Sequence, residues 1–466
     1  MFKRCGIVIL AWFCLFSGQS IAGAYAQVTA KDAARLKSDL TPYGAEKAGN
    51  KSGAIPAWDG GIKEKDIPHT YTLGIHHPDP YADDKPLYTV TASNMEKYLE
   101  QLPAGLQALL RQYPETFSIP VYPTHRSASA PQWVYDNIYK NATQAKLVNN
   151  GNGIAGAYAG IAFPIPAGAS GKADPLKVVW NHLTRWRGVF VKRNASEAVV
   201  QRNGAYSLVT SEQEIDFVYY HKDGSEKDLN NRLLYYVSQI KHPARLAGGA
   251  VLVHDTIDRV RDPRKAWGYN AGQRKLRRAP NLAYDTPIAS ADGIIVADDV
   301  DLFNGATDRY DWQLVGKKEL IIPYNNYQLD SNTISYDELL TVGHVNPQHT
   351  RYELHRVWVV EGTLKSGQRH IYSKRTFYID EDSWNIALAD QYDENGQLWR
   401  VSVSYLKNYY EVPVLWTALD VYHDLSSQRY YVAFLDNEEK QSLVFEDAYP
   451  PAKYFKPAQL RRRSRR

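Results

Sequence analysis

Cysteine is nearly absent from this sequence of 466 residues. The two that occur, Cys5 and Cys14, both lie close to the N-terminus. If this segment is removed during export, the mature chain has no thiol, which excludes disulfide bonds, a cysteine nucleophile and a cysteine-ligated metal. The mature protein is therefore expected to depend on its hydrophobic core for stability.

Long hydrophobic runs are missing as well. The apolar stretch Gly6–Phe16 follows two basic residues, is too short to span a membrane and precedes a cluster of small residues. This order is typical of a secretory signal peptide, which we predict over residues 1–26, with cleavage after Ala26 or, alternatively, after Ala24. The sequence thus predicts an exported protein.

A strong excess of one charge is also lacking, because 55 Lys and Arg residues stand against 51 Asp and Glu residues. Five of the positive charges are concentrated at the C-terminus, in Arg461–Arg466. We interpret this Arg-rich end as a frayed, solvated tail, with peripheral contact to an anionic membrane surface or a partner as the alternative. The charge balance does not support nucleic-acid binding.

Sequence motifs of hydrolases, zinc proteases, P-loop proteins and EF-hands are absent. The Gly-rich run 151–156 has no strand before it, so we interpret it as a loop rather than a dinucleotide fingerprint. A group of aspartates lacks the spacing of a Ca²⁺ loop and favours helix capping or a solvated face: Asp298, Asp299, Asp301, Asp308 and Asp311. We predict a protein that is not an enzyme, with no catalytic residues, no cofactor and no metal.

Tyrosine, by contrast, is abundant. The chain has 34 Tyr and 11 Trp residues against 12 Phe, within an ordinary content of 44% hydrophobic and 23% charged residues. Aromatic rings with a polar tip are common in β-sheets, binding grooves and interfaces. This composition favours a large sheet with an aromatic surface.

The clearest pattern lies in residues 351–406, where apolar residues recur at every second position. Turn residues at 366–367, 381–382 and 395–396 divide the segment into four strands, and Asn395-Gly396 is the dipeptide best suited to a tight hairpin. We predict a twisted antiparallel meander with one aromatic face and one face toward solvent. The aromatic face requires a cover, which a second sheet, a helix or a ligand could supply.

After the predicted signal peptide, the chain divides into three parts, and the meander belongs to the second of them. Residues 27–176 are predicted to form an N-terminal arm and a helical or irregular cover, with helices near 29–40, 94–110 (divided at Pro103) and 131–148. Residues 177–445 are predicted to form the β-sheet domain, with one helix over 292–302, and residues 446–466 a C-terminal tail.

Two groups of residues are candidate ligand contacts. The aromatic face of the meander is predicted to line a groove through Trp358, Val360, Trp384, Leu388, Trp399 and Val403. In the segment WNHLTRWRG (180–188), His182, Arg185 and Arg187 have the chemistry to bind a carboxylate or phosphate head group. The alternative for this segment is a polar strand edge whose Trp residues pack inward.

Several segments carry a resemblance to a known family: LTPYGAEKAGNKSGAIPAWDGG (40–61), WNHLTRWRG (180–188), RKLRRAPNLAYDTP (274–287), LFNGATDRYDWQLVGKKELIIPYNNYQL (302–329) and RYELHRVWVVEGTLKSGQRHIYSKRTFYIDEDSWNIALADQYDENGQLWRV (351–401). The chain resembles a Gram-negative family of exported proteins, a domain of unknown function labelled outer-membrane lipoprotein-sorting protein. The resemblance implies a periplasmic location and a lipoprotein-carrier-like fold. That fold is mainly β (α+β), a large curved antiparallel sheet or incomplete barrel with helices covering its concave side.

These observations predict a periplasmic carrier or binding protein for a hydrophobic ligand, which is a lipid, an acyl chain or a lipoprotein. One alternative is a non-catalytic accessory subunit that docks on an outer-membrane or transporter complex through an exposed aromatic surface. A less favoured alternative is a hydrolase acting on an envelope lipid or polysaccharide.

Overall fold

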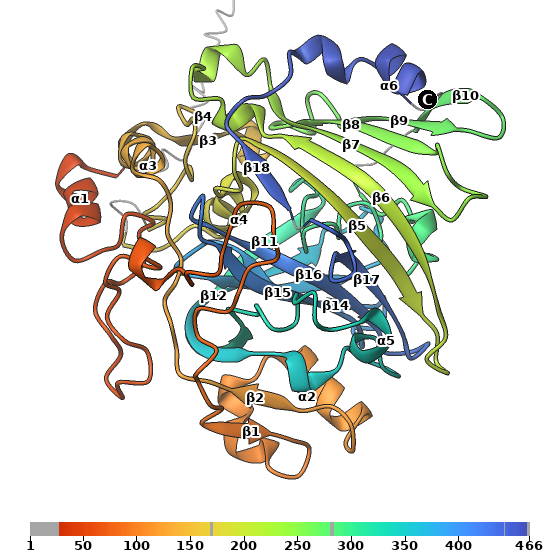
Figure 1. Cartoon of the computed structure of the whole chain (residues 1–466). Coiled ribbons are helices and arrows are strands. Elements are labelled where there is room, and N and C mark those ends of the chain that lie inside the picture. The colour runs from red at the N-terminus through yellow and green to blue at the C-terminus, as the bar shows by residue number, and fades with distance from the viewer. Residues whose placement is uncertain (1–27, 168–170, 280–283, 442, 464–466) are drawn as a thin grey trace, which may run out of the picture.

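The computed structural model describes residues 28–167, 171–279, 284–441 and 443–463, so the predicted signal peptide lies outside the described residues. Its main feature is a 16-stranded sheet (Figure 1). The strands of this sheet are β1 (Tyr88–Val90), β2 (Ile119–Val121), β5 (Phe190–Val200), β6 (Tyr206–Asp216), β7 (Arg232–His242), β8 (Ala250–Thr256), β9 (Lys265–Asn270), β10 (Lys275–Ala279), β11 (Tyr310–Pro323), β12 (Tyr352–Leu364), β13 (Lys374–Asp380), β14 (Ile386–Tyr392), β15 (Leu398–Tyr409), β16 (Val414–Asp424), β17 (Arg429–Leu435) and β18 (Val444–Glu446).

The strands follow the order β1-β2-β12-β13-β14-β15-β16-β17-β5-β6-β7-β8-β9-β10, with β11 beside β12 and β18 beside β5. All pairs are antiparallel except the single contact between β12 and β2. The sheet is twisted and open, because β1 and β10 form two separate ends. The predicted class, mainly β with an incomplete barrel, is therefore confirmed. β3 (Lys146–Val148) and β4 (Gly153–Ala155) form a separate small hairpin in the Gly-rich region.

Helices are short and lie around the sheet. They are α1 (Ala30–Ala34), α2 (Ala104–Gln112), α3 (Gln132–Gln144), α4 (Pro175–Thr184), α5 (Tyr336–Leu339) and α6 (Pro457–Arg463). The predicted division at Pro103 is observed, because a 3₁₀ helix over Met95–Gln101 ends before it and α2 begins after it. Across the described ranges, no helix combines the length and the apolar character that a membrane crossing requires.

The meander β12–β15 was predicted correctly, but its second face is not exposed to solvent. Both faces are buried, and the two hydrophobic clusters of the protein lie on opposite sides of it. One face packs beneath α4, while Leu106, Leu109 and Leu110 of α2 cover the other. Several of the polar residues predicted to face water are instead paired internally, as in the buried ion pair of Arg351 with Glu353 at 2.7 Å.

α4 was not predicted, and the proposed domain boundary at residue 177 falls inside it. The helix has clear local signals, since the Asp174 side chain accepts a hydrogen bond from the Leu176 backbone N–H at 2.9 Å and Pro175 occupies the first turn. Eight of its ten residues are buried, so it is a core helix. The segment WNHLTRWRG is therefore the end of a helix and the loop after it, not a strand edge.

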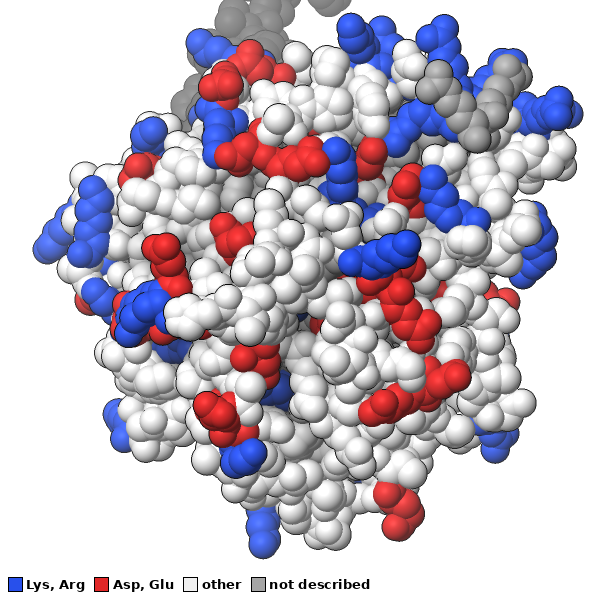
Figure 2. Space-filling view, in the orientation of Figure 1, with Lys and Arg blue, Asp and Glu red and all other residues white. Residues whose placement is uncertain are grey.

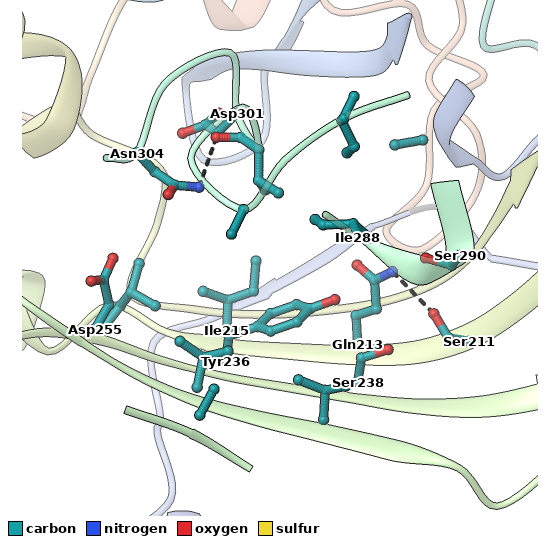
Figure 3. Close-up of a pocket in the computed structure, with 18 of the residues that line it drawn as sticks. Ser211, Gln213, Ile215, Tyr236, Ser238, Asp255, Ile288, Ser290, Asp301 and Asn304 are labelled. Carbon is teal, nitrogen blue, oxygen red and sulfur yellow. Dashed lines mark hydrogen bonds between the residues drawn. The ribbon is translucent and has the colours of Figure 1, made fainter. Parts of the chain in front are cut away.

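The helix predicted over 292–302 is wrong. This part of the chain consists of turns, and the only regular element between residues 284 and 304 is a 3₁₀ turn at Ala289–Ala291. Positive φ angles at Asp292, Gly293, Asp301 and Leu302 interrupt any helical run. Residues 284–304 form instead an irregular cover, which we call the lid segment, over the concave face of β5–β9 (Figure 3).

The interpretation of the Arg-rich end as a frayed tail is wrong for residues 461–463, the part of it that the structure describes, because they belong to α6. α6 and the turn before it pack on the outer face of β5–β9, where Phe455 stacks on Tyr235 with ring centroids 4.8 Å apart and Leu460 is buried. Arg463 also pairs with Glu214 at 2.8 Å. Together with the β9–β10 hairpin, α6 displays a group of basic residues (Figure 2), which we call the basic patch: Arg274, Lys275, Arg277, Arg278, Arg461 and Arg462.

Close packing of α2 on the meander gives a first testable prediction. A Cβ at Gly105 would meet a carboxylate oxygen of Asp390 and lie 2.5 Å from a methyl group of Val401. Gly105→Ala is therefore expected to lower the free energy of unfolding by about 1–3 kcal/mol, although alanine is the better helix former.

Chemical denaturation followed by tryptophan fluorescence measures this change. Gly268→Ala is the control, because its Cβ would meet nothing within 4 Å and its backbone needs no positive φ. Equal stability of Gly105→Ala and the wild type would contradict the packing of α2 described here.

Candidate ligand-binding cavity

The concave face of β5–β9 and the lid segment enclose a cavity with a volume of about 550 Å³ (Figure 3). β16 and β17 close it on a further side. Residues that β5–β8 contribute to its wall are Arg193, Glu197, Ser211, Gln213, Ile215, Leu233, Leu234, Tyr236, Ser238, Ile240, Ala250, Val251, Val253 and Asp255. The wall is mostly apolar, with polar groups at a few positions, which is the usual character of a small-molecule site.

Strand alternation positions these side chains. β5 and β6 direct odd-numbered residues such as Arg193 and Gln213 inward, whereas β7 directs even-numbered residues such as Tyr236 inward. Residues of the opposite parity, including Val237 and Leu252, pack outward against Phe455 and Leu460. The C-terminal helix thus covers the outer face, and the inner face is left to the cavity and the lid segment.

A second cavity of about 630 Å³ continues along the same face. It shares Ile240, Ala289 and Ser290 with the first cavity and extends to the β5–β6 turn at Tyr206. The two cavities are therefore neighbours beneath the lid segment, and we call them together the groove. Each has a volume within the range of about 300–1,000 Å³ that is typical of ligand pockets.

Two aspartates in the wall each pair with two arginines. Asp255 binds Arg259 at 2.9 Å and Arg264 at 3.0 Å. Asp301, from the lid segment, binds Arg185 at 2.5 Å and Arg187 at 2.6 Å. Burial alone would raise the pKa of each aspartate, but the adjacent guanidinium groups hold both pKa values well below their usual range. Both carboxylates are therefore ionised at neutral pH.

Two further charged residues, Glu197 and Arg193, line the same cavity. Glu197 accepts a hydrogen bond from the Tyr431 hydroxyl, and burial raises the pKa of its carboxyl group. Arg193 is 7% exposed, donates from Nε to Gln213 Oε1 at 2.8 Å and lies over the ring of Phe434 at 3.6 Å. Arg193 was not predicted as a site residue, although it shares strand parity with Val191 and Val199, which indicates an inward position.

The three predicted head-group residues are all buried. His182 receives a hydrogen bond at Nδ1 from the Ile386 backbone N–H at 3.1 Å, and its Nε2 lies 3.1 Å from the carbonyl oxygens of Asp301 and Phe303. Burial, reinforced by Arg185, lowers the pKa of His182 to about 3, so the ring is neutral with its proton on Nε2. His182 thus joins α4 to the β13–β14 hairpin and to the lid segment.

Arg185 and Arg187 differ in their access to the cavity. Arg187 and its partner Asp301 line the cavity, whereas Arg185 lies behind them and donates from Nε to Asn385 Oδ1 at 2.6 Å. Both guanidinium groups already have a carboxylate partner. A head-group role for His182, Arg185 and Arg187 stays a prediction, and Arg187 is the member of the three with a position to fulfil it.

The six predicted groove residues lie outside this cavity, and the expectation that they share one face is wrong. Val360 and Trp384 belong to the cluster beneath α4, with Trp358 packed against it, whereas Leu388 and Val403 belong to the cluster beneath α2. A β-bulge between β13 and β14 causes this division, because Ile386 pairs with Ile379 but Leu388 pairs with Tyr378. Trp399 is half-buried beside Tyr372.

Two buried groups of His and Asp side chains elsewhere have the spacing of metal ligands, namely His76, Asp330 and Asp436, and His355, Asp380 and Asp382. In each group a basic side chain already pairs with one carboxylate. Lys407 contacts Asp330, and Arg126 binds Asp382 at 2.6 Å. Both groups therefore have the character of internal ion-pair networks.

An open twisted sheet with a partly enclosed, mostly apolar groove defines the class of this protein as a mainly β scaffold with a ligand-sized cavity. The chain belongs to the family described as a protein of unknown function, DUF1329, whose model matches residues 89–461. This match confirms the family resemblance derived from the sequence.

The chain is also similar to several individual proteins. A protein of Pseudomonas aeruginosa, described as uncharacterized, is 47% identical over 436 residues, which cover 94% of each chain. The crystal structure of a DUF1329 family protein from Desulfovibrio piger is 15% identical, covers 59% of this chain and 92% of its own, and has a TM-score of 0.41. A putative outer membrane lipoprotein-sorting protein domain from Vibrio parahaemolyticus is 12% identical, covers 61% and 97% of the two chains, and has a TM-score of 0.42.

The ion pairs of Asp301 give a second prediction. Asp301→Asn leaves two buried arginines without a carboxylate, so the free energy of unfolding is expected to fall by about 3–5 kcal/mol at pH 7. A carboxyl group with a lowered folded-state pKa stabilises the fold above its unfolded pKa, and this contribution is lost as the pH falls. The difference in the free energy of unfolding between wild type and variant should therefore become smaller below pH 3.8, the ordinary pKa of an aspartate side chain.

Urea unfolding at a series of pH values measures this difference. Asp292→Asn is the matched control, because Asp292 lies in the same segment but forms an exposed ion pair with Arg429, so its loss should cost less than about 1 kcal/mol. An Asp301→Asn variant no less stable than Asp292→Asn would contradict this account.

Proposed function

We propose that this protein is a non-enzymatic carrier or binding protein of the periplasm, and that a hydrophobic ligand such as a lipid or an acyl chain occupies the groove beneath the lid segment. The observation that carries the proposal is the groove itself, since apolar side chains including Ile215, Val253 and Ile288 line its open space. Each CH₂ group transferred from water to such a surface contributes about 0.8 kcal/mol.

The surroundings of the groove support a carrier more than a structural void. Most of the meander is covered by packed side chains on both of its faces. The concave face of β5–β9, by contrast, borders the cavity. The basic patch lies on the same half of the sheet (Figure 1) and supports a peripheral contact with an anionic membrane surface during loading or release.

Blocking the groove tests the proposal directly. Ser238 points into the cavity from the middle of β7 (Figure 3), so Ser238→Trp should fill the space where a ligand lies. We expect the affinity for the apolar fluorescent probe N-phenyl-1-naphthylamine to fall at least about 10-fold, the equivalent of 1.4 kcal/mol. Fluorescence titration of the mature chain with the probe measures this affinity.

Gln239→Trp is the matched control, because the adjacent residue on β7 faces the opposite side of the sheet and should leave probe affinity unchanged. Native mass spectrometry and lipid extraction of protein purified from its own cell envelope complete the test. A retained lipid supports the carrier. A protein that binds no probe, retains no lipid and co-purifies with a membrane complex would instead support the accessory-subunit alternative.

A further inference from the structure

We propose that Arg193 is the receptor for an anionic head group, so that the ligand of the groove is an amphiphile with a carboxylate or phosphate at one end. This inference rests on the proposed function and names its ligand class. It depends on the position of Arg193 within the groove, on its lack of a carboxylate partner and on the charge balance of the wall.

Arg193 lies on the inward face of β5, between an amide and aromatic rings. Nε donates to Gln213 Oε1 at 2.8 Å, and the guanidinium group lies over Phe434, with the ring of Trp416 at 5.6 Å. This fixes the plane of the group. Nη1 and Nη2 donate no hydrogen bond to any residue that the structure describes, and the side chain lines the cavity. Two parallel N–H donors are thus available for a carboxylate or phosphate.

The other arginines in the wall already have partners. Arg259 and Arg264 bind Asp255, and Arg187 binds Asp301. No carboxylate of the described residues lies within the ion-pair distance of 4.0 Å from Arg193. The buried carboxylates Asp420 and Asp436 act on it only at longer range, and Glu197, farther along β5, is hydrogen-bonded to Tyr431.

The charge balance of the groove is therefore positive. The cavity wall carries four arginines, Arg187, Arg193, Arg259 and Arg264, against three carboxylates, Asp255, Asp301 and Glu197. Arg185 also shares Asp301 from behind the wall. Burial lowers the pKa of Arg193, which reflects the cost of an unpaired buried cation. Stacking on Phe434 recovers only part of that cost. An anionic ligand would recover the rest, whereas a neutral apolar ligand would leave Arg193 unpaired.

Matched probes that differ only in the head group test the inference. The probes are dodecanoate, dodecyl phosphate and dodecan-1-ol, titrated into the delipidated mature chain by isothermal titration calorimetry. An ionic hydrogen bond in such a site corresponds to a factor of about 10 to 100 in affinity, so both anions should bind more tightly than the alcohol by this factor. The ratio between the two anions distinguishes a carboxylate from a phosphate as the natural head group.

Variants then assign the effect to Arg193. Arg193→Gln should abolish the preference for the anions and leave the affinity for dodecan-1-ol within a factor of about 3. Lys192→Gln is the matched control, because Lys192 is the preceding residue on β5 but points to the outer face, where it pairs with Glu446 at 2.8 Å. This control should retain the full preference.

The outcomes separate this inference from the proposed function. If all probes bind with equal affinity and Arg193→Gln changes none of them, the groove holds a hydrophobic ligand but the head-group assignment is overturned. If no probe binds, both proposals are overturned. Should Arg193→Gln fail to fold, the comparison of anion and alcohol on the wild-type chain still decides the matter, because equal affinities would refute an anionic receptor.

Discussion

The ion pairs of the half-buried carboxylate of Asp301 are the interaction on which the arrangement of the groove depends. The carboxylate binds Arg185 and Arg187, at and just after the end of α4. The backbone carbonyl oxygen of Asp301 also accepts a hydrogen bond from His182. α4, the β13–β14 hairpin and the lid segment therefore meet at one point. If the lid segment left this end of the groove, both guanidinium groups would lose their carboxylate partner. A buried cation without a partner is costly, so this movement is unfavourable.

This constraint explains why the cavity lies in one half of the sheet. At the meander, α4 and α2 press on opposite faces and exclude any space between sheet and cover. Past β17 the sheet twists away from α4, and only the irregular lid segment spans the concave side. The outer face of the same strands is closed by α6.

Local patterns predicted much of the fold, and long-range contacts account for what was missed. Alternation and the Asn395-Gly396 turn were sufficient for the four strands of the meander. They could not show which faces are covered, because α2 and α4 lie more than 150 residues before the strands they cover. One bulge between β13 and β14 was enough to divide the predicted groove residues between two faces.

The candidate site illustrates the same limit. Asp301 was grouped with its neighbours in sequence as a capping or solvated residue, yet its partners Arg185 and Arg187 lie 116 and 114 residues away. Arg193 could be placed on an inward face from strand parity, but only the structure shows that the acidic residues nearby are engaged by other groups. The neighbouring arginines are neutralised by carboxylates of the protein itself. Arg193 is not, so its charge remains available to an anionic ligand that enters the groove.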